Sequence, residues 1–171
     1  MSQINGVVIG LVTNVQDPTH NGRIKVHFPW LDDQHESDWI RIATMMGGNG
    51  RGSFFMPEVN DEVLVAFDHG DVRFPYVVGF MWNGQDQPPT TDLQLRVIRS
   101  VNGHEIRLYD PPVQNGNQGY VRIQYARGDG SVNIVELANG GITISSDSAV
   151  QIVAPNVTIN GRLVAPTSGT I

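Results

Sequence analysis

The stretch that decides the fold runs from Gly47 to Gly84 and reads GGNGRGSFFMPEVNDEVLVAFDHGDVRFPYVVGFMWNG. It contains two short apolar runs, Val63–Phe67 and Tyr76–Phe80, separated by an acidic turn that includes His69-Gly70. Runs that are apolar on both faces are typical of strands buried on both sides. We therefore expect both strands in the interior of a small β-domain. No group of residues in the stretch has the pattern of a catalytic centre.

The residues before this stretch predict three more strands: Gly6–Val15, Arg23–Phe28 and Trp39–Ala43. Asn21-Gly22 is a strong hairpin signal just ahead of the second strand. In that strand Ile24, Val26 and Phe28 share one face, which predicts a core-facing side. Five strands and no helical period favour a small closed barrel of the OB type. The predicted class is all-β.

Changes in residue pattern along the chain predict three segments. Residues 1–86 form the predicted OB-fold domain, and the turn-rich segment Asn83–Thr91 marks its end. Residues 87–139 read as connector β-hairpins, with strands expected at Leu93–Ser100, His104–Tyr109, Gly119–Tyr125 and Ser131–Leu137. Residues 140–171 differ from both and form the predicted third segment.

The third segment has short apolar pairs at intervals of seven or eight residues, with Gly, Asn, Ser and Pro between them. The expected strand positions are Ile142 and Ile144, Val150 and Ile152, Val157 and Ile159, and Leu163. This spacing is typical of a β-helix or β-prism. Each strand has one apolar face and no helix is available to cover it, which would favour aggregation of a single chain. Three intertwined copies would cover these faces, so we expect a homotrimer.

Composition excludes several kinds of protein. The 171-residue chain has a net charge of −6 and a single lysine, Lys25, which argues against binding a phosphate backbone. It has no cysteine, so disulfide frameworks and thiolate metal sites are excluded. Leu31–Asp38 is acidic, but its spacing matches no cation-binding loop and we expect a solvated loop. We expect no catalytic, cofactor-binding or metal-binding residues, no signal peptide and no membrane-spanning segment.

The ordered motifs resemble the OB-fold domain of the VgrG and phage-spike family. They are GRIKVHFPW at Gly22–Trp30, DWIRIA at Asp38–Ala43, and the run Gly48–Gly84. The family pattern includes G-R-x-x-V-x-F/L-P-W and P-x-x-x-D-E-V-L-V-x-F, followed by an acidic-glycine turn, a Pro and V-V-G. The second part is matched by Pro57, Asp61, Glu62, Val63, Leu64, Val65, Phe67, Gly70, Pro75, Val77, Val78 and Gly79. Ile98–Ser100 and Gly103–Ile106 resemble the family's connector into the β-helix.

This resemblance implies a structural central spike of a contractile injection system rather than an enzyme. Three OB domains would form a collar, and the C-terminal regions would intertwine into a needle. The spike would plug the tube, nucleate the baseplate and puncture the target envelope, with transient contact with the target membrane. It would be assembled in the producing cell's cytoplasm as part of a phage tail-like particle.

The resemblance also implies partners. The OB domain begins near residue 1, so the hub is expected to be a separate baseplate protein. No histidine follows His104, so the metal-clamped apex of some spikes is absent and a PAAR-type tip protein is expected instead. Candidate tip-docking residues are Val164, Ala165, Pro166, Thr167 and Ser168. Candidate contacts to the neighbouring subunit or the hub are Gly48, Asn49, Gly50 and Arg51.

Two other functions remain consistent with the sequence. An OB module that binds nucleic acid would stack bases on exposed aromatic rings; the candidates are Phe28, Trp30, Phe54, Phe55, Tyr76 and Trp82. A trimeric fibre or adhesin would use a similar β-helical shaft. The Arg-Gly-Asp tripeptide at Arg127–Asp129 is a weak adhesion signal, and we expect a plain hairpin turn there.

Overall fold

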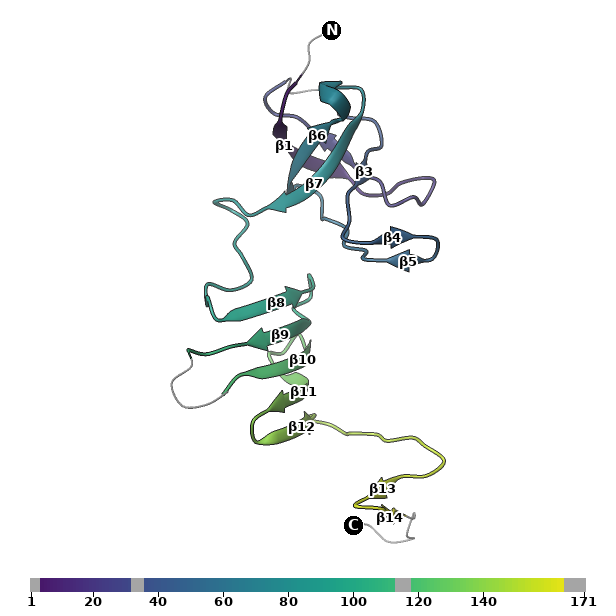
Figure 1. The fold of residues 1–171 in the computed structure, drawn as a ribbon, viewed down its shortest axis with the longest axis vertical. Coiled ribbons are helices and arrows are strands. Elements are labelled where there is room, and N and C mark those ends of the chain that lie inside the picture. Colours follow the sequence, from purple (N-terminus) through teal and green to yellow (C-terminus); the bar gives the residue numbers. More distant parts are fainter. Residues whose placement is uncertain (1–3, 32–35, 113–117, 165–171) are drawn as a thin grey trace. The chain divides into compact units, whose positions relative to one another are not determined.

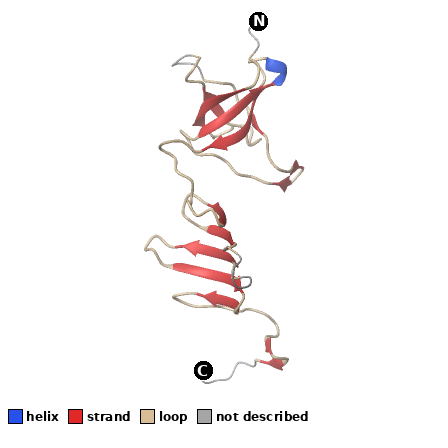
Figure 2. Ribbon diagram, turned by 60° about the vertical axis from the view of Figure 1, so that its left-hand side comes forward, coloured by secondary structure: helices blue, strands red, loops and turns tan. Residues whose placement is uncertain are grey.

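A computed structural model describes residues 4–31, 36–112 and 118–164. Within these residues the protein is all-β, apart from one short 3-10 turn at Asp68–Gly70, as Figure 2 shows. The all-β prediction is therefore confirmed for this part of the chain. The chain divides into two compact units, Met1–Pro88 and Pro89–Ile171.

The N-terminal unit is a five-stranded barrel (Figure 1). Its strands are β1 (Val7–Asn14), β2 (Lys25–His27), β3 (Arg41–Ile42), β6 (Glu62–Phe67) and β7 (Pro75–Met81), in the order β2-β1-β6-β7-β3. The two ends of this order meet at Ile24 and Ile40, whose backbone N–H groups donate to each other's carbonyls at 3.0 and 2.8 Å. This closure fits the predicted OB-type barrel, because a closed sheet has no free edge there.

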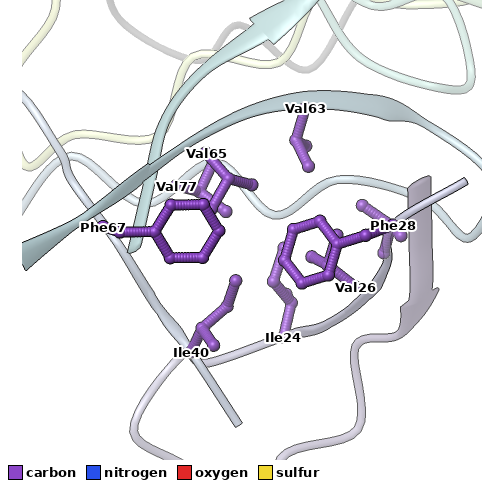
Figure 3. Packing of buried hydrophobic residues seen from close by; sticks show 9 residues of the cluster. Ile24, Val26, Phe28, Ile40, Val63, Val65, Phe67 and Val77 are labelled. Carbon is purple, nitrogen blue, oxygen red and sulfur yellow. The ribbon is translucent and has the colours of Figure 1, made fainter. Parts of the chain in front are cut away.

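The barrel core is built from the alternation expected in the second strand. Ile24, Val26 and Phe28 are all buried, and they pack against residues from the opposite wall of the barrel (Figure 3). The rings of Phe28 and Phe67 lie 5.9 Å apart between centroids. The cluster consists of Val12, Ile24, Val26, Phe28, Ile40, Val63, Val65, Phe67 and Val77.

The prediction that both central strands are buried on two faces was wrong for β7. In β6, Val63, Val65 and Phe67 are buried and the residues between them are half-buried. In β7 only Val77 is buried, while Val78 is 40% and Phe80 48% exposed. Val78 lies at the irregularity in the β6–β7 pairing, and Phe80, although opposite the buried Val63, lines a groove at the surface. In the part of this unit that the structure describes, no second layer packs over the outward face.

Gly10 in β1 is required by a close approach between strands. A Cβ at this position would lie 2.3 Å from Val26 Cγ1 and 3.3 Å from the carbonyl oxygen of His27. Val26 is fully buried, so its side chain has no free space to move into. The barrel therefore depends on a residue without a side chain at Gly10.

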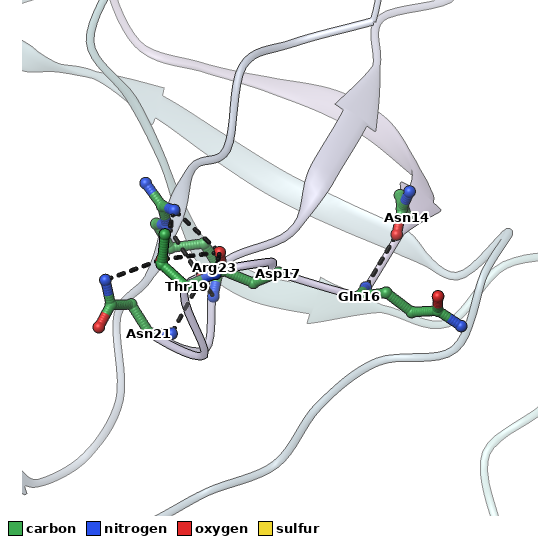
Figure 4. Close-up of polar contacts among 6 residues, drawn as sticks. All are labelled: Asn14, Gln16, Asp17, Thr19, Asn21 and Arg23. Carbon is green, nitrogen blue, oxygen red and sulfur yellow. Dashed lines mark hydrogen bonds and ion pairs between the residues drawn. The ribbon is translucent and has the colours of Figure 1, made fainter.

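A buried carboxylate organises the loop between β1 and β2 (Figure 4). Asp17 is 6% exposed and accepts hydrogen bonds from the backbone N–H groups of Thr19 at 3.0 Å and Asn21 at 3.0 Å. Arg23 closes the loop with two donors, Nη2 at 2.8 Å and Nε at 3.0 Å from the two carboxylate oxygens. Such a bidentate pair fixes both position and angle. The loop thus fixes the position at which the chain enters β2, so that the Ile24 side chain lies in the core.

These contacts shift the ionisation of Asp17. The Arg23 guanidinium, followed by hydrogen bonds from Thr19 and Asn21, holds the pKa of the Asp17 carboxyl far below its ordinary value, against the opposing effect of burial. Because the folded pKa is depressed, the stabilising contribution is complete above the pKa of the unfolded chain. It is lost as the pH falls toward the folded value.

The C-terminal unit contains a second five-stranded sheet, antiparallel throughout. Its strands are β8 (Leu95–Arg99), β9 (Glu105–Tyr109), β10 (Tyr120–Ala126), β11 (Val132–Ala138) and β12 (Gly141–Ser145). The order follows the sequence, so each strand pairs with the next. The hairpins expected at β8–β9 and β10–β11 are present. The predicted limit between residues 139 and 140 falls inside this sheet, because β12 pairs with β11 along its full length.

After β12 the described chain has little regular structure. A small hairpin joins β13 (Thr158–Ile159) to β14 (Arg162–Leu163), at two of the expected strand positions. Val150 and Ile152, where a strand was expected, are exposed and lie outside any strand. An extended segment of this kind has no partner strand within the described chain to supply its backbone hydrogen bonds.

We expect Gly10→Ala to destabilise the N-terminal unit by about 1–3 kcal/mol, the usual cost of overpacking a tight core. Urea unfolding measures this effect. Gly79→Ala in β7 is the matched control, because a Cβ there meets nothing within 4 Å. Equal stabilities of the two variants would contradict the close approach at Gly10.

We expect Asp17→Asn to lower the melting temperature at pH 7, because the neutral amide cannot replace the ion pair with Arg23. The difference from the wild-type protein should shrink below about pH 4, where the wild-type carboxyl of the unfolded chain takes up its proton. Thermal unfolding between pH 2 and pH 7 tests this. A difference that stays constant across that range would show that charge at Asp17 is irrelevant.

Candidate assembly surfaces

One face of the β8–β12 sheet carries an unbroken row of branched apolar side chains. The register places Ile98 opposite Ile106, Ile106 opposite Ile123, Ile123 opposite Val135, and Val135 opposite Ile144. We call these five residues the isoleucine row. Residues directly opposite in a sheet lie on the same face. All five are exposed, and Ile123 in the middle strand is 57% exposed.

A second row runs beside the first on the same face, at the position two residues away in each strand. It consists of Arg96, Leu108, Val121, Leu137 and Ile142, and we call it the leucine row. Its apolar members are also exposed, up to 71% at Ile142. Among the described residues of this unit, no helix or second sheet is layered over these rows. The result is an apolar surface far more continuous than the scattered apolar residues of ordinary surfaces.

The opposite face of the same sheet carries paired charges. The Glu105 carboxylate, with a side chain only 3% exposed, binds Arg107 directly and lies 3.4 Å from Arg99 Nη1. The hydrogen bond to Glu105 raises the pKa of Arg107 above its ordinary value. On the neighbouring strands Arg122 Nε donates to Glu136 at 2.7 Å. These charges satisfy each other within one chain, so this face needs no partner.

The N-terminal unit has an apolar groove beside a small hairpin. The hairpin joins β4 (Gly47–Gly48) to β5 (Arg51–Gly52), and its base is held by the hydrogen bond from Ser53 N–H to the Met46 carbonyl, 2.9 Å. The groove has a volume of about 880 Å³. Its exposed apolar lining is Met45, Met46, Phe54, Phe55 and Phe80.

The candidate contact residues Gly48, Asn49, Gly50 and Arg51 form the end of this hairpin. All four are exposed, and Gly50 adopts a φ of 65°, a conformation that glycine tolerates best. The Arg51 guanidinium lies over Gly48, where a Cβ would be 3.0 Å from Arg51 Cζ. The glycines therefore build a hairpin rather than a loose loop. Their role as a contact stays a prediction.

The candidate tip-docking residues are only partly within the described chain. Val164 is 43% exposed, and its N–H donates to the Val157 carbonyl at 2.7 Å. Ala165, Pro166, Thr167 and Ser168 lie outside the described residues. The proposal of a docking surface there stays a prediction.

The described residues contain no cluster of three or more metal-binding side chains. In the acidic loop, the Glu36 carboxylate is held by Lys25 Nζ at 2.7 Å and by Thr13 Oγ1 at 2.6 Å, contacts that lower its pKa. Asp61 Oδ2 accepts the Glu58 N–H at 2.8 Å, a bond that shapes a turn. These carboxylates therefore form hydrogen bonds or ion pairs that stabilise the loops of the N-terminal unit. The described helical segment is far too short to cross a membrane.

The Arg-Gly-Asp tripeptide forms the end of the β10–β11 hairpin, as expected. Arg127 Nη1 pairs with Asp147 at 2.9 Å, and Asp129 Oδ1 accepts hydrogen bonds from Ser131. These Ser131 bonds lower the pKa of the Asp129 carboxyl. Both charged side chains of the tripeptide are thus engaged within the chain.

Comparison with known proteins identifies the N-terminal unit. Residues 8–82 match the family described as the type VI secretion system/phage-baseplate injector OB domain. The matched range contains the five strands of the barrel except Val7, the first residue of β1. This match assigns residues 8–82 to that OB-domain family.

Curated relatives agree with this assignment. The chain is similar to the type VI secretion system spike protein VgrG3 of Vibrio cholerae, with 29% identity over 118 residues. It is also similar to the spike protein VgrG1a of Pseudomonas aeruginosa, with 36% identity over 72 residues. The actin cross-linking toxin VgrG1 of Vibrio cholerae is 29% identical over 97 residues. These matches cover 63%, 40% and 52% of this chain but only 12%, 11% and 9% of the relatives.

The sequence interpretation missed two surfaces. It treated residues 87–139 as hairpins without assigning their faces, although EIRLY at Glu105–Tyr109 and VRIQY at Val121–Tyr125 alternate strictly. That alternation was enough to predict one apolar and one charged face. The groove beside the β4–β5 hairpin had no comparable signal, because its lining comes from segments that only the fold brings together.

Proposed function

We propose that this protein is the structural central spike subunit of a contractile injection system and acts as a homotrimer. The observation that carries the proposal is the uncovered apolar face formed by the isoleucine and leucine rows. A single chain would expose this face to water at a cost of about 25 cal/mol for each Å² of apolar surface. Copies of the chain that share the face in a common core would avoid that cost.

Three sheets facing one another also explain the distribution of charge. The apolar rows would form the walls of a shared core, and the paired charges of Glu105, Arg107, Arg122 and Glu136 would face outward. In such a shaft, hydrogen bonds hold the strands together and apolar packing stabilises the core. The shaft would therefore be rigid and would need no catalytic residues. We infer a C-terminal region wound as a trimeric β-helix or β-prism, which suits a needle that plugs the tube and punctures the target envelope.

We propose one partner for each of the two units. A separate hub protein of the baseplate would dock at the groove of the N-terminal unit, next to Gly48–Arg51. A PAAR-type tip protein would dock at residues 164–168. The protein would be assembled in the producing cell's cytoplasm, nucleate the baseplate, and contact the target membrane only transiently. We propose no enzymatic activity, no cofactor and no nucleic-acid partner.

The alternative of a nucleic-acid-binding OB module loses support in the structure. Phe28, one of the candidate stacking residues, is buried in the core. Phe54, Phe55 and Trp82 are exposed, but the net charge of −6 opposes binding of a phosphate backbone. The exposed rings fit protein contacts better.

We expect Ile123→Ser to weaken the trimer by at least about tenfold for each chain, because burial of an isoleucine contributes roughly 1.5–3 kcal/mol. Sedimentation equilibrium of the full chain measures the association. Gln124→Ser, on the opposite face of the same strand, is the matched control and should leave the association unchanged. Trimers of equal stability for both variants would remove the basis for the proposed shared core.

We expect Phe54→Ser to abolish co-purification with the baseplate proteins encoded beside this chain, since it removes a large exposed ring from the groove. The trimer should persist. Phe74→Ser is the control, because Phe74 is 58% exposed in the same unit but does not line the groove. Undiminished co-purification of the Phe54 variant would exclude the groove as the hub contact.

A further inference from the structure

Asparagine directly precedes glycine at many points along this chain. Eight of the 19 glycines follow an asparagine, and the pairs begin at Asn5, Asn21, Asn49, Asn83, Asn102, Asn115, Asn139 and Asn160. Turn formation explains why the dipeptide occurs, because Asn and Gly both tolerate the positive φ that tight hairpins require. The same dipeptide also places a carboxamide beside a backbone nitrogen that no neighbouring Cβ shields. Turn formation makes no use of this second property.

Three of these pairs form the two-residue ends of hairpins. Asn49-Gly50 joins β4 to β5, Asn139-Gly140 joins β11 to β12, and Asn160-Gly161 joins β13 to β14. All three asparagines and the glycines that follow them are exposed. Within the described chain, no hydrogen bond engages these asparagine side chains or the N–H groups of the glycines after them. Both groups are therefore free to approach each other at each hairpin end.

Two other pairs are held by hydrogen bonds. Asn83 Oδ1 accepts two backbone N–H groups, at 2.7 and 2.8 Å, and Asn83 Nδ2 donates to Asp86 Oδ2 at 2.9 Å. The Asn102 side chain is exposed, but the N–H of Gly103 donates to the Ser100 carbonyl at 2.9 Å. Asn83 thus has a fixed carboxamide, and Asn102 is followed by a backbone nitrogen that is already engaged.

We propose that Asn49, Asn139 and Asn160 are sites of spontaneous deamidation in the folded protein. The glycine nitrogen attacks the asparagine Cγ, so that a C–N bond forms and the bond from Cγ to Nδ2 breaks. Nδ2 leaves as ammonia with the proton of the glycine N–H, and a five-membered succinimide remains. Water then adds to either ring carbonyl and breaks one ring C–N bond, which gives aspartate or isoaspartate. Water is the only co-reactant.

Deamidation at a hairpin end changes both charge and backbone. Each event adds a carboxylate that is ionised at neutral pH, and the isoaspartate form also adds one methylene to the backbone of a two-residue turn. At Asn49 the new charge lies in the hairpin end next to Arg51. Arg51 is the only Arg or Lys among the described residues that line the groove. Deamidation of Asn49 therefore opposes the positive charge beside this groove.

Peptide mapping by mass spectrometry tests the proposal on the full folded chain, incubated in mildly alkaline buffer. Trypsin cleaves after arginine, so three separate peptides contain Asn49, Asn83 and Asn102. Fragmentation distinguishes the events at Asn139 and Asn160, which share one peptide. We expect each of the three hairpin ends to deamidate at least about tenfold faster than either held pair, because a held pair must first open.

Two controls separate the chemistry of the dipeptide from the effect of the fold. In concentrated urea all five positions should deamidate at similar rates, because unfolding removes the hydrogen bonds that hold Asn83 and Gly103. Asn49→Gln should abolish the event at that position, since the longer side chain closes a cyclic imide much more slowly. The same variant should leave the rates at Asn139 and Asn160 unchanged.

The possible results either support or refute the proposal. Hairpin ends that react in urea but keep their amides in the folded chain would refute it, because the turns themselves would then prevent the attack. Rates at Asn83 or Asn102 in the folded chain equal to those at the hairpin ends would also refute it, because the hydrogen bonds would then give no protection.

Discussion

The uncovered apolar face of the β8–β12 sheet is the constraint on which the rest of the structure depends. Ile98, Ile106, Ile123, Val135 and Ile144 lie opposite one another across all five strands and remain exposed. The barrel of the N-terminal unit, in contrast, buries its own core and closes on itself through Ile24 and Ile40. One unit buries a core of its own, whereas the other has an apolar face that the described residues of the same unit leave exposed.

The carboxylates that could have suggested a reaction serve the structure: Asp17 organises a loop, Glu36 binds Lys25, and Glu105 binds arginines within its own sheet. The match of residues 8–82 to the injector OB domain gives these observations a context, because similar proteins are named as spike proteins of type VI secretion systems. A spike needs rigid assembly, and both proposed interfaces serve that need.

Sequence patterns predicted the features that arise from local alternation. Ile24, Val26 and Phe28 were expected in the core and are buried there, and the hairpins at β8–β9 and β10–β11 were expected. The burial of β7 was predicted wrongly, because an apolar run in the sequence does not show whether each side chain faces a core or the surface. The groove beside the β4–β5 hairpin had no sequence signal, because its lining comes from segments that only the fold brings together.

The most direct test of the central claim is the molar mass of the unmodified full chain in solution at neutral pH, measured by sedimentation equilibrium over a wide range of concentration. The shared apolar core predicts a mass three times the 18.8 kDa of one chain, maintained on dilution. A folded species of 18.8 kDa at every concentration would contradict it, because the isoleucine row would then be stable in water without a partner.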